Sequence, residues 1–456
     1  MTPERALAQF VTGTRFQDLP EEPVTVARKI VLANVGTIIA GASEEGCAAL
    51  VNQVKGWGGR PEATILVYGD RVPAHNAAFA NSVMARALDF DDGMEPGIHI
   101  GASAVPTALA LAELVGGCSG KEFLTALVVG AEVAARLVSA TKASLVHEGF
   151  DPTGVCTVFA AAAITGRMLR LNQTQMLHAL ALAFNRAGGS FQSNIDGALA
   201  VRFIQGFASE AGVLCARLAN EGITGPKNFL EGVFGFYNLY AREECDRAIA
   251  TAELGKTFRM TRDMFKRFPN CGSTIASTDA IFELVHEEGL TPEDVERIDI
   301  AVTPPTYHLV GKPFVIGENP RVDGQFNIAY CVANVLLRKD SRLEHFEASA
   351  ISDSRIMPIA GKVHITADPK LEERGLLAMD MVVTTTRGAV YRRSVDVPHG
   401  FPGSPLTHAE HVKRFQQCLD YARTPPPKEN AERLISMIDR LEDVEDVRSL
   451  IPLLVS

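Results

Sequence analysis

The chain has 456 residues, of which 46% are hydrophobic and 21% are charged, and its 44 Lys and Arg against 54 Asp and Glu give a formal net charge of −10. This composition excludes disordered, collagen-like and disulfide-scaffold proteins, and the length fits about two domains. No run of basic residues marks a surface for nucleic acid or for an anionic membrane, so we expect neither partner.

Helical patterns follow one another from residue 23 to about residue 240, with glycine or polar loops between them. Many are apolar nearly all round and rich in Ala, Gly and Ser, which is typical of central helices in a large bundle. The most apolar stretches, at Ala102–Gly117 and Thr153–Gly166, fall short of the roughly 20 apolar residues that a membrane span needs. The predicted helices are Val24–Ala42, His75–Leu88, Thr107–Val115, Phe123–Ala140, Val155–Leu169, Thr174–Ala187 and Phe207–Asn220.

The composition changes near Lys256, beyond which short runs of period-two alternation predict strands. The last two of these strands are expected to form a hairpin, and a helical pattern returns at His408. The predicted elements of this part are helices at Ser273–Glu288 and Ile328–Leu337, strands at Arg297–Val302, Lys362–Ala367, Met379–Val383 and Ala389–Val397, and terminal helices at His408–Arg423, Glu429–Leu441 and Asp443–Leu450.

These patterns predict a mainly α fold class with two domains. A large all-helical domain comprises residues 1–260 and is completed by residues 408–456, and a smaller α+β domain comprises residues 261–407. Eight cysteines lie at long intervals without a Cys-x-x-Cys pair, and residues 1–10 do not resemble a secretory leader. We therefore expect a cytoplasmic protein.

One segment, from Ala87 to His99, combines several carboxylates with a Gly/Pro loop and a histidine. A helix that continued into it would place Asp89 and Asp92 on one face, with Asp91 pointing away. The loop would then deliver His99 to the start of the next helix, where free N–H groups suit an anion. A histidine held there beside carboxylates can transfer protons, whereas the alternative interpretation is a helix cap and a satisfied core histidine.

Two further polar loops have the same design. Gly149–Gly154, which contains Asp151, precedes one helix, and Lys266–Thr274 precedes another. Three such loops, each leading into a helix N-terminus, suit a substrate with several carboxylates. The alternative for Asp151 is again a simple helix cap.

Seven segments, taken in chain order, resemble those of the MmgE/PrpD family of 2-methylcitrate dehydratase, cis-aconitate decarboxylase and iminodisuccinate epimerase. The resemblance implies a homodimer with an all-helical domain, an α+β lid domain and an active site in the cleft between them. It also implies proton transfer next to a carboxylate of a small di- or tricarboxylic acid, with neither organic cofactor nor metal. The segments are Ala33–Ala42, Leu88–Pro106, Gly149–Gly154, Gly222–Phe236, Lys266–Ala280, Gln325–Ala333 and Gly400–Thr407.

Asp89, His99, Lys266 and Tyr330 stand where the family has its Asp, His, Lys and Tyr. The resemblance implies that they are catalytic: His99 or Lys266 would act as base or acid, Tyr330 would donate a proton or a hydrogen bond, and Asp89 would orient His99. Lys266 is also a cation suited to a substrate carboxylate. Without the resemblance, Tyr330 in an apolar helix would be interpreted as a core tyrosine.

Substrate binding is expected from Asp92, Asp151 and Arg202, but the last two mark departures from the family. Asp151 replaces the His of the family loop, and Val201 replaces a Lys, which leaves Arg202 as the nearest cation. Arg202 can bind a carboxylate in bidentate fashion but cannot act as a base. Asp151 can act as a base if burial raises its proton affinity, or it only caps the helix.

Two more residues of the acidic segment depart from the family. Gly93 stands where many members have Thr, and Glu95 replaces a frequent His. We predict a lyase of the dehydratase type, with epimerase or isomerase second and decarboxylase third, acting on a small di- or tricarboxylic acid or a less charged relative. The other hypothesis is a paralogue that binds a metabolite or a partner without catalysis, which Val201 and Asp151 favour.

Overall fold

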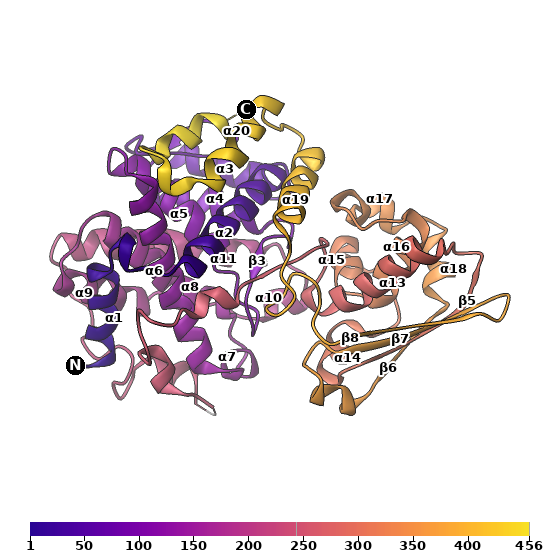
Figure 1. Cartoon of the computed structure of the whole chain (residues 1–456). Helices are drawn as coiled ribbons and strands as arrows, with labels where there is room; N and C mark the ends of the chain where they lie inside the picture. The colour runs from indigo at the N-terminus through magenta and orange to yellow at the C-terminus, as the bar shows by residue number, and fades with distance from the viewer. Residues whose placement is uncertain (243, 456) are drawn as a thin grey trace. The chain divides into compact units, whose positions relative to one another are not determined.

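The computed structural model describes residues 1–242 and 244–455, and the chain divides into two compact units. The first, which we call the helical unit, comprises Met1–Asp263 and His411–Ser456, and the second, the α+β unit, comprises Met264–Glu410. The boundaries thus fall after residues 263 and 410, where the sequence places them after residues 260 and 407. Figure 1 shows the helical unit mainly in indigo, magenta and yellow and the α+β unit in orange tones.

The predicted fold class, mainly α with a smaller α+β part, is confirmed. Helix α8 packs against α5, α6, α9 and α11, and α4 packs against α2, α5 and α11. Small residues allow these contacts: a Cβ at Gly212 of α11 would lie 2.4 Å from the Cβ of Ala161 of α8. The main helices are α2 (Glu21–Gly41), α4 (Ala74–Arg86), α5 (Gly101–Leu114), α6 (Gly120–Thr141), α8 (Pro152–Met168), α9 (Gln173–Phe184) and α11 (Ala200–Asn220).

The helical unit also contains elements that the sequence did not predict, such as α1 and α3. The segment predicted as a helix at Asp443–Leu450 is instead a 3₁₀ helix at Val447–Leu453. The short strands β1 (Ala63–Thr64) and β2 (Arg71–Val72) pair antiparallel. The remaining elements are α1 (Pro3–Gly13), α3 (Cys47–Trp57), β3 (Asp92–Gly93), α7 (Ser144–His147), α10 (Gln192–Ile195), α12 (Phe236–Tyr240), α19 (His408–Tyr421) and α20 (Lys428–Asp439).

Two helices, α2 and α6, are long and apolar enough to cross a membrane by length and composition alone, although the sequence had predicted only shorter apolar stretches. Within their most apolar windows, 78% of α2 and 94% of α6 are buried inside the protein. Helices at the centre of a bundle are apolar all round for the same reason as membrane spans, because neither contacts water. The burial of α2 and α6 inside the protein is therefore typical of core helices.

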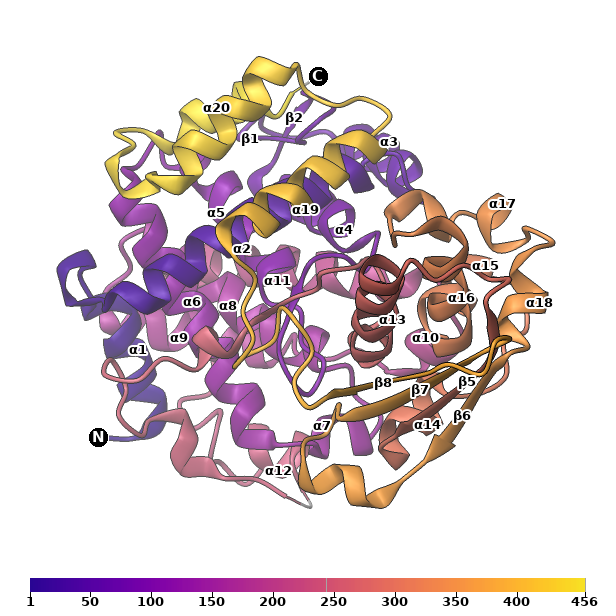
Figure 2. The same ribbon diagram turned by 45° about the vertical axis from the view of Figure 1, so that its right-hand side comes forward.

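The α+β unit is built on a four-stranded sheet of order β6-β5-β7-β8. The four strands and the hairpin of β7 and β8 occur where the sequence predicts them, and β5 and β6 pair in parallel. Helices α13 and α16 lie over one face of this sheet, as Figures 1 and 2 show. The strands are β5 (Val295–Val302), β6 (Val363–Ala367), β7 (Met379–Thr385) and β8 (Val390–Val395), and the other elements are β4 (Met264–Phe265), α13 (Ile275–Glu288), α14 (Pro304–Val310), α15 (Pro320–Gln325), α16 (Ile328–Arg338), α17 (Ala348–Ile351) and α18 (Ile356–Ala360).

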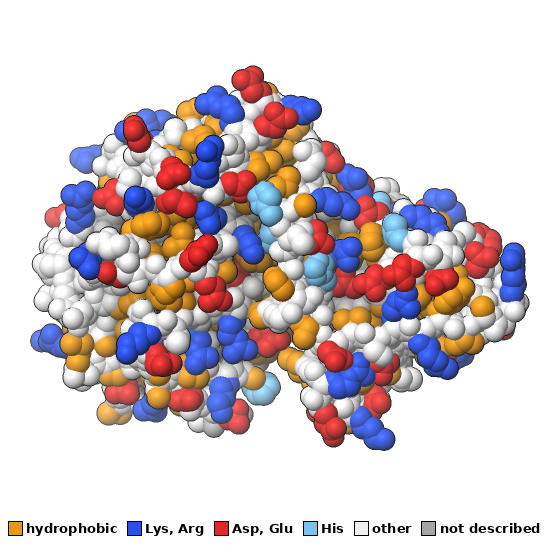
Figure 3. Space-filling view, in the orientation of Figure 1, with side chains coloured by type: hydrophobic (Ala, Val, Ile, Leu, Met, Phe, Trp, Pro, Cys, Tyr) orange, Lys and Arg blue, Asp and Glu red, His pale blue; other side chains and the backbone are white. Residues whose placement is uncertain are grey.

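Surface charges of both signs are mixed. On the face that Figure 3 shows, Lys and Arg side chains lie interspersed with Asp and Glu over both units. Many form local pairs, such as Lys55 with Asp70 at 2.8 Å and Arg374 with Asp380 at 2.8 Å. Exposed pairs of this kind each stabilise a protein by no more than about 1 kcal/mol.

A buried carboxyl in the α+β unit makes stability depend on pH. Asp279 of α13 accepts hydrogen bonds from Arg267 Nη1 and the His399 N–H, each at 3.0 Å, yet burial raises its pKa from 3.8 to about 6. Because the folded protein holds this proton more tightly than the unfolded chain, its contribution to the free energy of unfolding falls by about 3 kcal/mol as pH rises from 4 to 6. Replacing Asp279 with Asn is expected to remove this contribution.

The measurement is urea unfolding of both proteins at several pH values. The variant should gain stability relative to the wild type between pH 4 and 6. A wild-type minus variant difference that does not change with pH would contradict the raised pKa of Asp279.

Candidate active site

The acidic segment leaves the helix earlier than predicted. Helix α4 ends at Arg86, and Asp89 adopts a left-handed backbone with φ of +52°. Asp is one of the few residues with a side chain that enter this region readily. Consequently Asp89 and Asp92 do not share a helix face, and the prediction that Asp91 points away is wrong: its side chain is fully buried and lies against His99.

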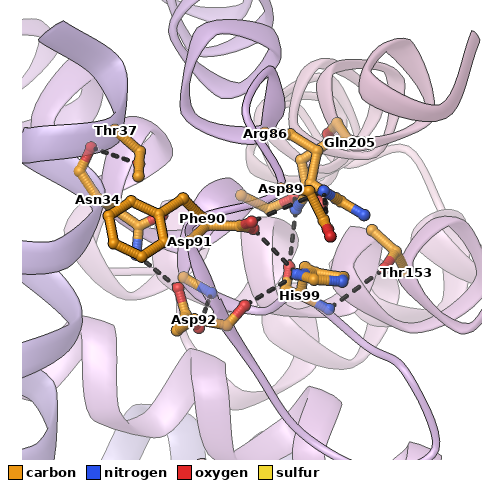
Figure 4. Close-up of polar contacts among 12 residues, drawn as sticks. Asn34, Thr37, Arg86, Asp89, Phe90, Asp91, Asp92, His99, Thr153 and Gln205 are labelled. Carbon is orange, nitrogen blue, oxygen red and sulfur yellow. Dashed lines mark hydrogen bonds and ion pairs between the residues drawn. The ribbon is translucent and has the colours of Figure 1, made fainter. Parts of the chain in front are cut away.

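The main chain of His99 is held from two sides. Its N–H donates to Thr153 Oγ1, at the start of α8, at 3.2 Å, and its carbonyl accepts from Gln205 Nε2 of α11 at 2.8 Å. These bonds fix the loop just before α5, so the imidazole projects from a rigid support, as Figure 4 shows. Gln205 holds the main chain of His99, and the sequence did not reveal it. A single polar residue on a largely apolar helix is too common to stand out.

The imidazole of His99 makes all its described contacts through one nitrogen. Nδ1 lies 2.8 Å from the main-chain carbonyl of Asp92 and 3.0 Å from Oδ2 of Asp91. Over residues 1–242 and 244–455, no hydrogen bond joins Nε2 to the protein. The residue is 9% exposed. A nearly buried imidazole with a carboxylate on one side is an arrangement suited to general acid–base catalysis.

Two buried guanidinium groups balance the carboxylates. Arg86 Nη1 lies 2.7 Å from Asp89 Oδ1 and 3.7 Å from Asp91 Oδ1. Burial opposes the charge on Arg86, but the surrounding carboxylates outweigh this effect and raise its pKa. Arg414 of α19 donates to the carbonyl of Phe90 at 2.5 Å, and its guanidinium lies 4.4 Å from the centre of the Phe90 ring. Sequence analysis missed both residues, and Arg414 is 324 positions from its partner.

A metal site at this cluster is disfavoured. Asp89, Asp91 and His99 each offer one ligand atom, and these atoms lie within 4.8 Å of one another. However, the nitrogen of His99 that faces the carboxylates is the one bonded to the Asp92 carbonyl, and Arg86 already supplies a cation at 2.7 Å from Asp89. A divalent cation would have to compete with that buried guanidinium.

Asp92, predicted to bind substrate, instead anchors the start of α5. Its Oδ1 accepts from Asn34 Nδ2 at 2.5 Å and its Oδ2 accepts from the Gly101 N–H at 2.8 Å. Only glycine fits at position 101, because a Cβ there would lie 2.1 Å from Asp92 Oδ1. Complete burial raises the pKa of Asp92, and the negative charge of the nearby Asp91 raises this pKa further. With both oxygens bonded inside the protein, this carboxyl holds the helix rather than a ligand.

Asp151 occupies the N-cap of α8, so the capping interpretation describes its position. Oδ1 accepts from the Thr153 N–H at 2.8 Å and Oδ2 accepts from Asn194 Nδ2 at 3.0 Å. The cap is linked to His99 through Thr153, whose hydroxyl accepts from the His99 N–H. Its charge also helps to raise the pKa of Arg86.

The remaining predicted site residues are Arg202 of the helical unit and Lys266 and Tyr330 of the α+β unit. Arg202 donates from Nη1 to the carbonyl of Glu45 at 2.8 Å, which turns it toward the loop between α2 and α3. Lys266 belongs to the α+β unit, directly after β4, and is 2% exposed. Tyr330 is completely buried on α16, packs against Phe314 and Phe346, and donates its hydroxyl to the His345 carbonyl.

Burial also raises the pKa of Tyr330. This placement is that of a core tyrosine, the alternative that the apolar helix alone suggests. The predicted catalytic role of Tyr330 is therefore not supported by its surroundings within the α+β unit, where its hydroxyl already has a main-chain acceptor.

The fold and the cluster together define a mainly α protein of two units whose helical unit carries a buried histidine–carboxylate cluster. Comparison with protein families identifies the group to which it belongs. The model of the MmgE/PrpD N-terminal domain matches residues 5–247, and that of the MmgE/PrpD C-terminal domain matches residues 268–443. The chain belongs to the MmgE/PrpD family, as the resemblance of its segments predicts.

Known relatives cover almost the whole chain. The cis-aconitate decarboxylase of Homo sapiens is 26% identical over 98% of this chain and 94% of its own length. The enzyme of the same name from Mus musculus is 24% identical, over 98% and 92%. The one from Aspergillus terreus is 23% identical, over 98% and 95%. The protein is thus similar along its length to enzymes that act on a carboxylic acid.

Proposed function

We propose that this protein is a lyase that acts on a small di- or tricarboxylic acid by proton transfer at the carbon next to a carboxylate. The observation that carries the proposal is His99, nearly buried, fixed by its main chain and flanked by Asp91. Such a group can take a proton from carbon and return it to a leaving group or to a product carbon. Membership of the MmgE/PrpD family and the names of the relatives support the same class of substrate.

Lys266 is our proposed cation for a substrate carboxylate. It is buried in the α+β unit, and a lysine withdrawn from water is suited to holding a carboxylate. Within the helical unit, by contrast, Arg86 and Arg414 already bind Asp89 and the Phe90 carbonyl. Arg202, which faces Glu45, is not part of the proposal.

Two lyase reactions fit this chemistry. Dehydration, which the sequence predicts, removes a proton from carbon and then a hydroxyl group. Decarboxylation replaces a carboxylate by a proton, and the names of the similar proteins from man, mouse and Aspergillus terreus favour it. Both reactions require one group that exchanges a proton with carbon: His99 takes this proton in dehydration and supplies it in decarboxylation.

The test is proton NMR of the purified protein in D₂O with citrate, 2-methylcitrate, cis-aconitate, itaconate, malate and iminodisuccinate. We expect new product signals or loss of signals from protons next to a carboxylate for at least one acid. The products distinguish loss of water from loss of carbon dioxide. If no acid reacts but one raises the melting temperature, the non-catalytic binding hypothesis replaces this proposal.

We also propose that the protein is a homodimer. Helix α11 exposes a stripe of apolar side chains, Phe207, Leu214 and Leu218, and Trp57 of α3 is exposed as well. Phe79 joins the two, with its ring centre 5.3 Å from that of Phe207 and 6.5 Å from that of Trp57. A contiguous apolar surface of this kind is typical of an interface.

The prediction is a particle of twice the mass of one chain in light scattering coupled to gel filtration. Replacing Leu218 with Glu, which puts a charge into the stripe, should yield monomers. Replacing Glu210 with Gln on the same helix is the control. A wild-type protein that is monomeric at micromolar concentration would contradict the proposal.

A further inference from the structure

We propose that Asp91 and the main-chain carbonyl of Asp92 hold His99 in the tautomer that carries its proton on Nδ1, so that Nε2 is the nitrogen that exchanges protons with the substrate. Asp91, rather than Asp89, is then the positioning residue of the acid–base group. The kinetic part of this inference rests on the proposed function, whereas the tautomer belongs to the protein without substrate.

The carbonyl of Asp92 is the first argument. It lies 2.8 Å from Nδ1 of His99 and can only accept a hydrogen bond. Nδ1 must therefore bear a proton to form this bond. In a neutral imidazole the other nitrogen, Nε2, then carries the lone pair. Nε2 is also the ring nitrogen without a hydrogen-bond partner among the residues that the structure describes.

The second argument is the orientation of the Asp91 carboxylate. Oδ2 lies 3.0 Å from Nδ1 of His99, while Oδ1 lies 3.7 Å from Nη1 of Arg86. Figure 4 shows Asp91 directed at His99, with Arg86 and Asp89 beside it. When Nε2 takes a proton from the substrate carbon, the ring becomes a cation, and Oδ2 of the Asp91 carboxylate lies 3.0 Å from its Nδ1. Asp91 therefore stabilises the charge that forms during the reaction.

The third argument is that the main chain of His99 is fixed and that Asp91 is buried beside its ring. Thr153 and Gln205 hold the N–H and the carbonyl of His99, and Asp91 is completely buried. By contrast, Asp89 pairs with Arg86, with its Oδ1 2.7 Å from Nη1. The resemblance to the family implies that Asp89 orients His99, and the structure gives this position to Asp91 instead.

These contacts predict that asparagine is worse than alanine at position 91. Arg86 can only donate, so in the Asp91→Asn variant it favours the amide oxygen on its own side, which turns the amide NH₂ toward Nδ1 of His99. Two donors would then face each other, and the ring would relieve this by moving its proton to Nε2. With alanine, no donor opposes Nδ1, and the carbonyl of Asp92 still selects the correct tautomer.

The first measurement is the ring spectrum of His99 in ¹⁵N-histidine-labelled protein without substrate, assigned by comparison with His99→Gln. At a pH where the ring is neutral we expect the proton on Nδ1 in the wild type and in Asp91→Ala, and on Nε2 in Asp91→Asn. A wild-type proton on Nε2 would overturn the inference. This readout does not depend on turnover, so it stands or falls separately from the proposed function.

The second measurement is the kinetics of both variants with the acid identified by NMR. We expect kcat to fall about 10²- to 10⁴-fold in Asp91→Asn and about 10-fold in Asp91→Ala, with KM changed little. The control for loss of a charge is Asp443→Asn, an exposed carboxylate of the same unit. A merely structural role predicts the opposite order, because alanine leaves a cavity that asparagine fills. That order would also overturn the inference.

Discussion

Replacing His99 with Gln is expected to lower kcat by about 10²- to 10⁴-fold, because the variant keeps the polar contacts of the loop but loses the group that exchanges a proton with carbon. Glutamine can still donate to the carbonyl of Asp92, which lies 2.8 Å from Nδ1 in the wild type. Thr153 and Gln205 bind only the main chain of residue 99, so the fold should survive. The measurement is kcat and KM with the acid that reacts in D₂O.

His364 offers a matched control, since it is an exposed histidine on β6 of the other unit. His364→Gln should retain full activity. If His99→Gln turned over substrate at a rate within about threefold of that control, His99 would not be the acid–base group, and the proposed mechanism would have to be assigned to Lys266 or to another residue.

Most of the fold could be predicted because its signals are local. The strands β5 and β7 show period-two alternation, and β7 has buried residues at every second position. The central helices are rich in small residues because backbones approach closely, as at Gly212 and Ala161. The parallel pairing of β5 with β6 was not predictable in this way, since about 60 residues separate the strands and no local pattern specifies such a partner.

The two helices that the sequence analysis did not predict, α1 and α3, have recognisable residues at their ends. Helix α1 has Thr2 as its N-cap, with a side-chain bond to the Arg5 N–H, and Pro3 at its first position. Helix α3 begins after Gly46, which adopts a left-handed backbone, and ends before Gly58. Both have the start and stop residues that mark helices elsewhere in the chain.

The histidine–carboxylate cluster was only partly predictable from sequence. The histidine and the carboxylates were found because they lie within eleven residues of one another, from Asp89 to His99. The error about Asp91 arose because Asp89 leaves the helix through a left-handed conformation, and helical spacing does not reveal where a helix stops. Arg414 could not have been found, because it reaches Phe90 from a helix at the other end of the chain.

A buried ion pair in α6 makes the helical unit sensitive to the loss of one charged partner. Glu132 and Arg136 are both 0% exposed, and Arg136 Nε lies 2.6 Å from Glu132 Oε1. Arg136 also donates to the carbonyls of Ile249, Ala252 and Thr257, at 2.7 to 2.9 Å. The pair therefore holds the segment from 249 to 260 against the central helix.

Replacing Glu132 with Ala is expected to lower the free energy of unfolding by about 3–5 kcal/mol. The substitution leaves a guanidinium buried without its carboxylate, and it removes the acceptor of the Met260 N–H, which lies 2.9 Å from Oε2. Burial raises the pKa of Glu132, and Arg136 and the main-chain donors oppose that rise. The measurement is urea unfolding followed by circular dichroism.

The double replacement of Glu132 with Leu and Arg136 with Met distinguishes charge from hydrogen bonding. Buried ion pairs can often be exchanged for apolar residues at little cost, which would restore stability. Here the exchange would also remove the hydrogen-bond partners of three carbonyls and one N–H in the segment from 249 to 260. We therefore expect the double variant to remain destabilised by more than about 2 kcal/mol. Glu122→Ala, at the exposed start of the same helix, should cost only about 1 kcal/mol and serves as the control. Full recovery in the double variant would show that the pair stabilises the fold through its charges alone and that the segment holds its place without it.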